Sequence, residues 1–315
     1  MLSYLVRRLV TAAISVLLAS LLVFSAVLAI PGDPAEVLLG FDASPAALAA
    51  VRAELGLDRP PVQRYLAWLG DVLRGDLGTS LVYDRPVRAL VAERLGVSVP
   101  LTLLAATLAT VLALPLGIAA ARARGGWLDP SLMAVAQLGA AVPSFWLGLL
   151  LVLAFAVERS WLPAAGFVPW SQDPLASLRS LLLPVLALSL GQAALLARMT
   201  RAAMIDALAT DYVRTARAKG ASEGRVVRRH AFRNALLPIV TILGLALGNV
   251  FIGSIVIEEV FALPGLGRLA LSAIGNRDLP LLQGEVLLYA TVLILLGLLV
   301  DLAYAAIDPR VRIDA

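Results

Sequence analysis

Cysteine is absent from the 315 residues of the chain, and histidine and lysine each occur once, as His230 and Lys219. Without cysteine the chain has no disulfide, no thiolate metal ligand and no redox chemistry at sulfur. A single histidine excludes zinc motifs that need paired histidines. A phosphate-binding P-loop has glycine directly before its lysine, but Ala218 precedes Lys219, so the chain contains no P-loop. If ATP drives this protein, another polypeptide hydrolyses it.

Charge is also scarce. Only 15% of the residues are charged, against about a quarter in soluble domains. Hydrophobic residues make up 60%, the mean hydropathy is +0.89, and the apolar residues occur in long blocks, as bilayer spans do. The net charge of +4 does not indicate a nucleic-acid partner, because the arginines lie mostly at the ends of apolar runs, where they determine topology. The composition predicts an all-α membrane protein that contacts lipid.

Six apolar segments predict six transmembrane helices. The first is the uncharged run 9–30 behind Arg7 and Arg8, which we interpret as a retained span because it ends in PGDP and not in a cleavage site. The other spans lie within 95–121, within 130–157, from about 181 to 205, at 234–257 and at roughly 283–307. This divides the chain into an N-terminal helix (1–30), an extracytoplasmic segment (31–94), a five-helix transmembrane domain (95–307) and a tail (308–315).

The extracytoplasmic segment is rich in proline and contains three stretches with spaced apolar residues, at 48–58, 61–75 and 86–95. We expect these to be short amphipathic helices, the last leading into the second span. GDLGTS at 75–80 is predicted to form a glycine-containing turn.

The short loops determine the orientation of the spans. If the N-terminus is cytoplasmic, the cytoplasmic segments carry 13 basic residues and the short outer loops carry four. The long segment 31–94 counts little in this comparison. We therefore expect both termini and the insert 206–233 to be cytoplasmic.

The most charged stretch is the insert between the fourth and fifth spans, with seven basic residues between Arg214 and Arg233. The segment after Asp211 is predicted to be a helix that ends at Gly220 in a left-handed turn. Ser222 is expected to cap a second helix that continues towards Pro238. Such a basic loop could simply be solvated, but the order helix, glycine, helix favours a docking element with small residues around its turn.

This insert resembles the EAA loop of permease subunits of bacterial ABC importers, and most closely those of the dipeptide and oligopeptide importers. The resemblance covers almost the whole chain. The motifs that carry it are RR at 7–8, PGDP at 31–34, GDLGTS at 75–80, RPV at 85–87, PSFWLGLLL at 143–151, DYVRTARAKG at 211–220, RHAFRNALLP at 229–238, VFALPGLGRL at 260–269 and DLAYAAIDPR at 301–310.

The resemblance implies a type I ABC importer permease fold in the bacterial cytoplasmic (inner) membrane. It implies a second homologous permease subunit, two ABC ATPase subunits on the cytoplasmic loops and an extracytoplasmic substrate-binding protein. The chain itself would have no catalytic residue, no cofactor and no metal. It would move peptides or similar small solutes by alternating access; relatives also carry nickel chelates, glutathione or haem.

The same resemblance assigns ATPase coupling to the loop around Gly220. With Gly220 aligned to the glycine of the EAA pattern, Arg214 and Thr215 replace its first two residues and only Ala216 and Gly220 match. The expected coupling residues are Arg214, Thr215, Ala216, Arg217, Lys219, Gly220, Ala221, Ser222 and Glu223.

Polar residues within the spans are candidates for the translocation pathway, because their burial in lipid is costly. Gln137, Gln192 and Asn249 could line a hydrated path or form hydrogen bonds between helices. Glu258 and Glu259, at the outer end of the fifth span, could meet a peptide amine or have a structural role. Gly244 and Gly248 permit close helix packing, either within the subunit or across a dimer.

Two other classes of function were considered. An ion-coupled secondary transporter would need carboxylates near mid-span, and the sequence has almost none away from span ends. A membrane enzyme or scaffold lacks a site, since the chain shows no nucleophile with a neighbouring base. We interpret His230, within a basic helix, as a structural or docking residue.

Overall fold

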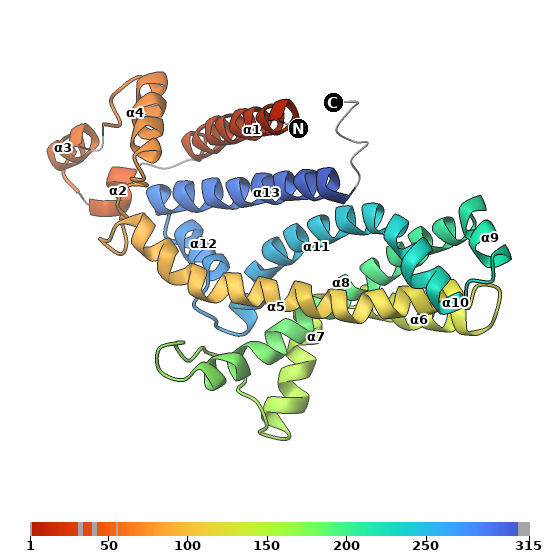
Figure 1. Cartoon of the computed structure of the whole chain (residues 1–315). Helices are drawn as coiled ribbons and strands as arrows, with labels where there is room; N and C mark the ends of the chain where they lie inside the picture. The colour runs from red at the N-terminus through yellow and green to blue at the C-terminus, as the bar shows by residue number, and fades with distance from the viewer. Residues whose placement is uncertain (1, 31–33, 40–42, 55, 308–315) are drawn as a thin grey trace. The chain divides into compact units, whose positions relative to one another are not determined.

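The computed structural model describes residues 2–30, 34–39, 43–54 and 56–307, and the regular elements in these ranges are all helices (Figure 1). Five of them are long and apolar enough to cross a membrane: α1 (Leu2–Leu28), α5 (Val87–Arg122), α8 (Pro174–Leu208), α11 (Phe232–Val260) and α13 (Leu279–Ile307). They confirm the first, second, fourth, fifth and sixth predicted spans. The predicted tail, 308–315, lies outside the described residues.

The third predicted span is not one straight helix. It consists of α6 (Leu128–Ala141), α7 (Ser144–Leu151) and the π-helix η1 (Val152–Val157), with a bend of 91° between the two halves. The break lies at Pro143, because proline lacks a backbone N–H and disfavours helical geometry in the residue before it. Val142 is accordingly extended, with φ −88° and ψ 122°. The predicted total of six spans therefore holds only if this bent pair counts as the third span.

The chain folds into two compact units that alternate along the sequence. Unit 1 contains residues 1–5, 98–264 and 296–315, and unit 2 contains residues 6–97 and 265–295. In unit 1, α6, α7 and α11 pack against α8, whose buried face includes Leu181, Leu196 and Met204. A side chain at Gly244 would collide with Val300, so this glycine allows α11 and α13 to approach closely within one subunit.

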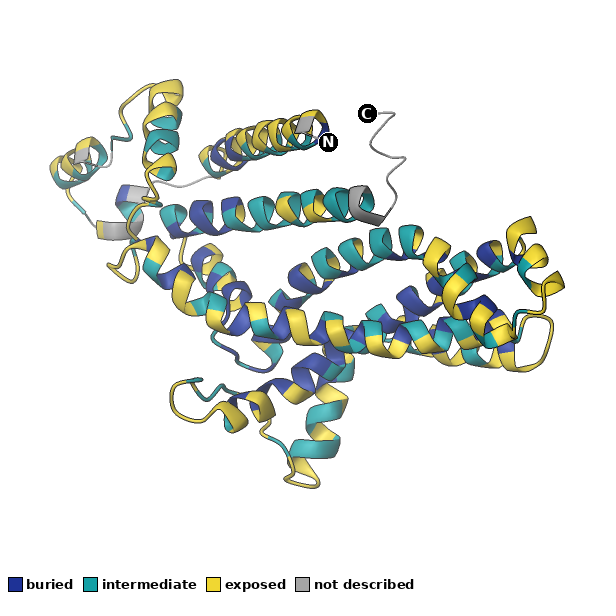
Figure 2. Cartoon of the chain, in the orientation of Figure 1, coloured by how far each residue is buried: buried dark blue, intermediate teal, exposed yellow. Residues whose placement is uncertain are grey.

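In unit 2, the segment after α1 forms α2 (Pro34–Leu39), α3 (Pro45–Glu54) and α4 (Pro61–Leu73), and α12 (Leu266–Gly275) precedes α13. The predicted helices at 48–58 and 61–75 are thus present as α3 and α4 with shifted ends. The predicted helix at 86–95 is the first part of α5 and not a separate element. Most of the surface of α1 is exposed, as expected for a helix that faces lipid (Figure 2).

The GDLGTS turn of unit 2 is held by a buried carboxylate far away in sequence. Gly75 and Gly78 have positive φ, as predicted for this turn. Asp278, directly before α13, accepts hydrogen bonds from the Ser80 hydroxyl (2.5 Å) and from backbone N–H groups of Leu81 (3.2 Å) and Val82 (3.2 Å). Because Asp278 is fully buried, these bonds compensate its desolvation. We call residues 75–86 the GDLGTS loop.

Candidate functional site: the loop between α8 and α11

The loop between α8 and α11 begins with α9 (Asp211–Ala218), which ends as the sequence predicted. Gly220 has φ +79°, in the left-handed region. Its N–H donates to the Arg217 carbonyl (2.9 Å), and the Ala221 N–H donates to the Ala216 carbonyl (3.1 Å). This pair of bonds is a Schellman motif, which satisfies the last carbonyls of a helix. The turn is therefore built by local backbone geometry.

The second limb starts at α10 (Glu223–Arg225), continues through the π-helix η2 (Val226–Ala231) and merges into α11. The predicted merging with the fifth span is confirmed. Ser222 occupies the predicted N-cap position with extended geometry, but its side chain makes no capping hydrogen bond. Its carbonyl accepts instead from the Arg225 and Val226 N–H groups, which is enough to start the helix.

An ion pair joins the two limbs across the turn. Arg217 Nε lies 2.7 Å from Glu223 Oε1, and Arg217 Nη2 lies 3.3 Å from Glu223 Oε2. The Glu223 carboxylate raises the pKa of the Arg217 guanidinium, chiefly through the side-chain hydrogen bond. Both side chains are largely solvent-exposed, 40% for Arg217 and 59% for Glu223, so the pair orients the limbs more than it stabilises the fold.

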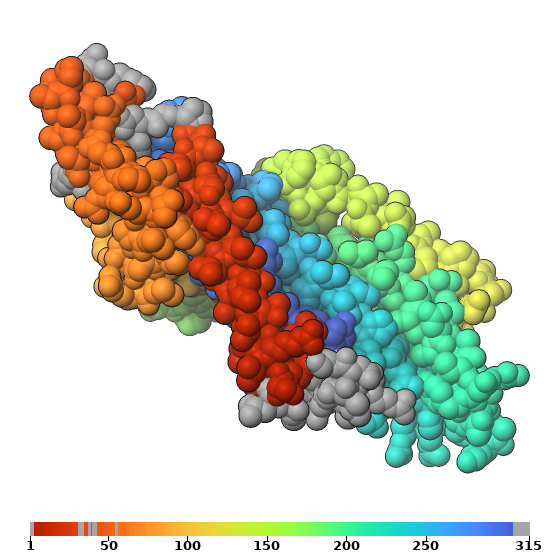
Figure 3. Space-filling view, turned by 90° about the horizontal axis from the view of Figure 1, so that it is seen from above, coloured from red at the N-terminus to blue at the C-terminus, as the bar shows by residue number. Residues whose placement is uncertain are grey.

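The loop has one buried face and one open face. Val213, Val226, Val227 and Ala231 are buried, and Val227 and Ala231 belong to an apolar cluster with Met204 of α8. Of the nine expected coupling residues, seven are exposed, and Ala216 and Ala221 are half-buried. Figure 3 shows the loop, in green to cyan, at the edge of the molecule. We call these nine residues the coupling surface.

A hollow of about 340 Å³ lies beside this surface within unit 1. Arg122 at the end of α5 and Arg124 in the turn after it line this hollow together with Arg217 and Glu223. Its lining therefore carries three guanidinium groups and one carboxylate. An acidic side chain of a docking protein would be electrostatically favoured there.

The five pathway candidates do not share a cavity among the described residues. Gln137 is exposed and lines a hollow of about 340 Å³, whereas Gln192 lines another of about 360 Å³ and has a buried Oε1 without a hydrogen-bond partner. Asn249 and Glu259 are exposed. Glu258 is fully buried and accepts from the Ser98 hydroxyl at 2.6 Å, so its carboxylate takes part in packing α11 against α5.

Sequence reasoning missed an ion pair beside Gln137. Arg201 of α8 contacts Asp129 of α6 through both carboxylate oxygens, at 2.5 Å and 2.6 Å, and the Asp129 side chain is only 8% exposed. This bidentate geometry links the two helices at one end of the Gln137 hollow. Opposite charges at the facing ends of consecutive spans were the signal that could have revealed it.

Comparison with known proteins agrees with this architecture. Residues 113–313 match the family described as binding-protein-dependent transport system inner membrane component, and residues 1–102 match the N-terminal model of the same membrane component. A chain of the MetNI methionine ABC transporter, in inward-facing conformations, superposes with a TM-score of 0.58 at 18% identity, covering 70% of this chain and 96% of that chain. That likeness supports the fold.

Curated relatives cover the whole chain. A protein of Brucella abortus (strain 2308), whose name assigns it to a peptide transport system as a permease, is 44% identical over 314 residues, 100% of both chains. The glutathione transport system permease protein GsiC of Pectobacterium atrosepticum is 43% identical over 312 residues, 99% of both chains. The chain therefore belongs to the family of binding-protein-dependent transport system inner membrane components.

Proposed function

We propose that the chain is the permease subunit of an ATP-driven importer that moves peptides or similar small solutes across the cytoplasmic membrane. The observation that carries this proposal is the helix–glycine–helix loop between α8 and α11. Its exposed side is the coupling surface, and its buried side packs on the apolar ends of α8 and α11. A loop anchored in this way transmits the movement of a docked protein to the spans. Family membership supports this function over ion-coupled secondary transport.

The coupling surface is the proposed docking site of an ABC ATPase subunit. Gly220 leaves open space where a Cβ would be, so another backbone can approach the turn closely. ATP-driven closure of two ATPases would pull this loop and its counterpart in a second, homologous permease together and alternate access to the path. The chain supplies no step of ATP hydrolysis itself.

The remaining partners follow from the proposed orientation. With both termini and the coupling surface cytoplasmic, segment 31–94 lies outside and forms part of the platform for a substrate-binding protein. Names of relatives point to peptides or glutathione as solutes, and the proposed substrate class is accordingly a small peptide. Gln137, Gln192, Asn249, Glu258 and Glu259 remain proposed contacts of the pathway.

The test is substitution at the turn. Gly220→Leu places bulk on the docking face, and Ala216→Asp places a charge there. For each variant, peptide uptake by cells and the ATPase recovered with the tagged full-length chain are measured. We expect uptake to fall at least about tenfold, equivalent to about 1.4 kcal/mol of lost docking energy, with less ATPase recovered.

Gly166→Leu is the matched control. Gly166 also has positive φ, +87°, and open space around its Cβ position, but it lies in the loop before α8, far in sequence from the coupling surface. This variant should retain uptake and ATPase recovery. Normal uptake and ATPase recovery in both coupling-surface variants would overturn the docking assignment, and uptake that persists without any ATPase would overturn the importer assignment.

A further inference from the structure

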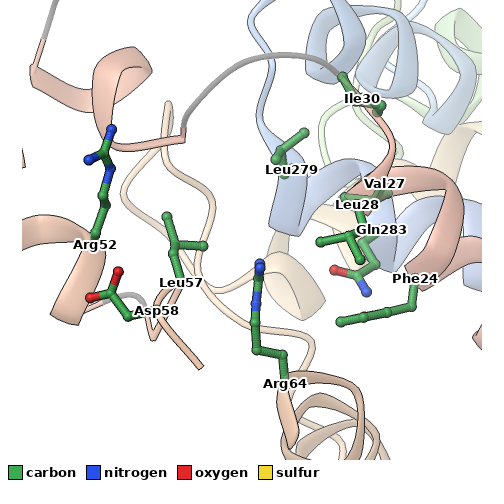
Figure 4. A pocket seen from close by; sticks show the side chains of 10 residues that line it. All are labelled: Phe24, Val27, Leu28, Ile30, Arg52, Leu57, Asp58, Arg64, Leu279 and Gln283. Carbon is green, nitrogen blue, oxygen red and sulfur yellow. The ribbon is translucent and has the colours of Figure 1, made fainter. Parts of the chain in front are cut away.

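A pocket of about 270 Å³ lies within unit 2, where the end of α1, helices α3 and α4, and the start of α13 meet (Figure 4). None of the residues around it belongs to the coupling surface or to the proposed pathway. Its walls divide into an apolar part and a polar part. The apolar part is formed by Phe24, Val27, Leu28 and Ile30 at the end of α1 with Leu57 and Leu279, and the polar part by Arg52, Asp58, Arg64 and Gln283.

In the polar part of the pocket, Gln283 and Arg64 carry hydrogen-bond donors that the described residues do not use. Gln283 is only 9% exposed, and its amide nitrogen has no hydrogen-bond partner in the described part of the chain. A buried, unpaired amide is costly, and native proteins rarely keep one without a ligand or water. Arg64 extends from α4 into the same space (Figure 4), and no described residue forms an ion pair with it.

The charge of the pocket favours an anion. Arg64 contributes a guanidinium group that pairs with no described carboxylate, and Arg52 and Asp58 add one further charge of each sign to the lining. Guanidinium groups bind phosphate oxygens through paired N–H donors. An amide N–H₂ such as that of Gln283 adds a neutral donor to the same oxygen atoms. The polar part therefore suits a phosphodiester.

The apolar part indicates where such a group comes from. Leu17, Leu21 and Leu28 share one face of α1, are between 44% and 49% exposed, and end at the pocket. Beside it, Phe24, Tyr65 and Trp68 form an aromatic cluster with ring centroids 5.5–6.2 Å apart. Tyrosine and tryptophan gather at the level of lipid headgroups. A headgroup in the pocket would thus have its acyl chains along the exposed leucines of α1.

We propose that this pocket binds one phospholipid with an anionic headgroup, with its phosphodiester on Arg64 and Gln283 and its acyl chains on α1. The lipid would connect α1, α4 and α13 of unit 2 and satisfy the buried amide. This site is independent of the importer function, because it depends only on α1 lying in a bilayer.

The experiment uses the full-length chain, purified in mild detergent with the subunits that accompany it and depleted of lipid. Binding of phosphatidylglycerol is measured by native mass spectrometry, and the midpoint of thermal unfolding is measured with and without that lipid. We expect Arg64→Gln to weaken phosphatidylglycerol binding about tenfold, because one charge-assisted contact is lost. Arg74→Gln is the control, since Arg74, just after α4, is exposed, pairs with Asp71 and does not line the pocket.

Gln283→Leu is the second variant and separates ligand binding from folding. Leucine removes the unpaired amide at similar size, so the lipid-free midpoint should stay the same or rise, while the lipid-induced rise in midpoint should shrink. A lower lipid-free midpoint with unchanged lipid binding would mean that Gln283 is only structural, and would overturn the proposal. Equal phosphatidylglycerol binding by the wild type and Arg64→Gln would also overturn it.

A third measurement distinguishes a lipid headgroup from a water-soluble phosphate compound. Soluble glycerol phosphate carries a phosphate and a glycerol group without acyl chains, and we expect it to leave bound phosphatidylglycerol in place at equal concentration. Displacement of the lipid by glycerol phosphate would assign the pocket to a water-soluble phosphate compound and would overturn lipid binding.

Discussion

Two glycine turns in this protein are stabilised in different ways. In the loop between α8 and α11, Gly220 closes a Schellman motif whose bonds join residues five or fewer apart, and the exposed Arg217–Glu223 pair spans six positions. In the GDLGTS loop, Gly75 and Gly78 form the turn, but the loop is held by Asp278, about 200 residues further along the chain. The first turn is held by local, exposed bonds, whereas the second is held by a non-local contact, in which Ser80 and Asp278 are buried although most of the loop is exposed.

The difference agrees with the docking role proposed for the loop between α8 and α11. A loop that docks another protein must leave its polar atoms in water until the partner arrives, so local bonds and an exposed ion pair are sufficient. The GDLGTS loop turns the chain into α5 and lies against the start of α13, where its contacts with Asp278 resist movement. A buried carboxylate with several donors provides that resistance, because removing it strands all of its partners.

The largest effect should come from Asp278→Ala. It leaves the Ser80 hydroxyl and the N–H groups of Leu81 and Val82 without their acceptor, so we expect a loss of about 3 kcal/mol in the free energy of unfolding. Tryptophan fluorescence during thermal unfolding in detergent measures it. Asp76→Ala in the same loop removes one exposed bond to the Gly78 N–H and should cost about 1 kcal/mol or less. Similar losses in the two variants would contradict the conclusion that the buried Asp278 contacts hold this loop more strongly than an exposed local bond does.

A smaller, local effect is expected from Gly220→Ala. Alanine fits the open space but is strained at φ +79°, which costs about 1 kcal/mol. Hydrogen exchange of the Ala221 amide, which bonds to Ala216, should become about fivefold faster, because opening of the turn is easier. Gly166→Ala carries the same strain elsewhere and should leave exchange in α9 unchanged. If Gly166→Ala accelerated hydrogen exchange of the Ala221 amide equally, the turn at Gly220 would not be determined by local bonds.

The smallest effect is predicted for Arg217→Gln. The ion pair with Glu223 is exposed, so its removal should cost about 0.5 kcal/mol or less at low salt. Near 1 M salt, where the Debye length is about 3 Å, the wild type and the variant should exchange Gly220 and Ala221 amides at the same rate. A difference that persists at high salt would mean that the pair is more than an exposed contact.

Sequence alone identified most of what is local in this protein. The long apolar runs predicted five spans that the structure confirms, since a helix that crosses lipid must satisfy its own backbone and be largely apolar. Gly220 predicted the end of α9 because few other residues adopt positive φ without strain. Ser222 lies at the N-cap position that the sequence predicted, but its side chain makes no capping bond, so sequence identified the position and not the contact.

What the sequence left open depends on contacts between distant segments. The sequence did not predict the 91° bend at Pro143. Pro100 and Pro115, by contrast, lie within α5, which continues through both prolines. Proline removes one hydrogen bond in each case, and the packing around it decides whether the helix continues.

The composition, the positions of the spans and the helix–glycine–helix of the coupling surface were therefore determined by the sequence itself. Only the tertiary structure placed Asp278 on the GDLGTS loop, paired Asp129 with Arg201 and left the Gln283 amide nitrogen without a partner among the described residues. The physical reason is that backbone geometry and transfer into lipid act residue by residue, whereas the partner of a buried charge or amide is chosen by the fold.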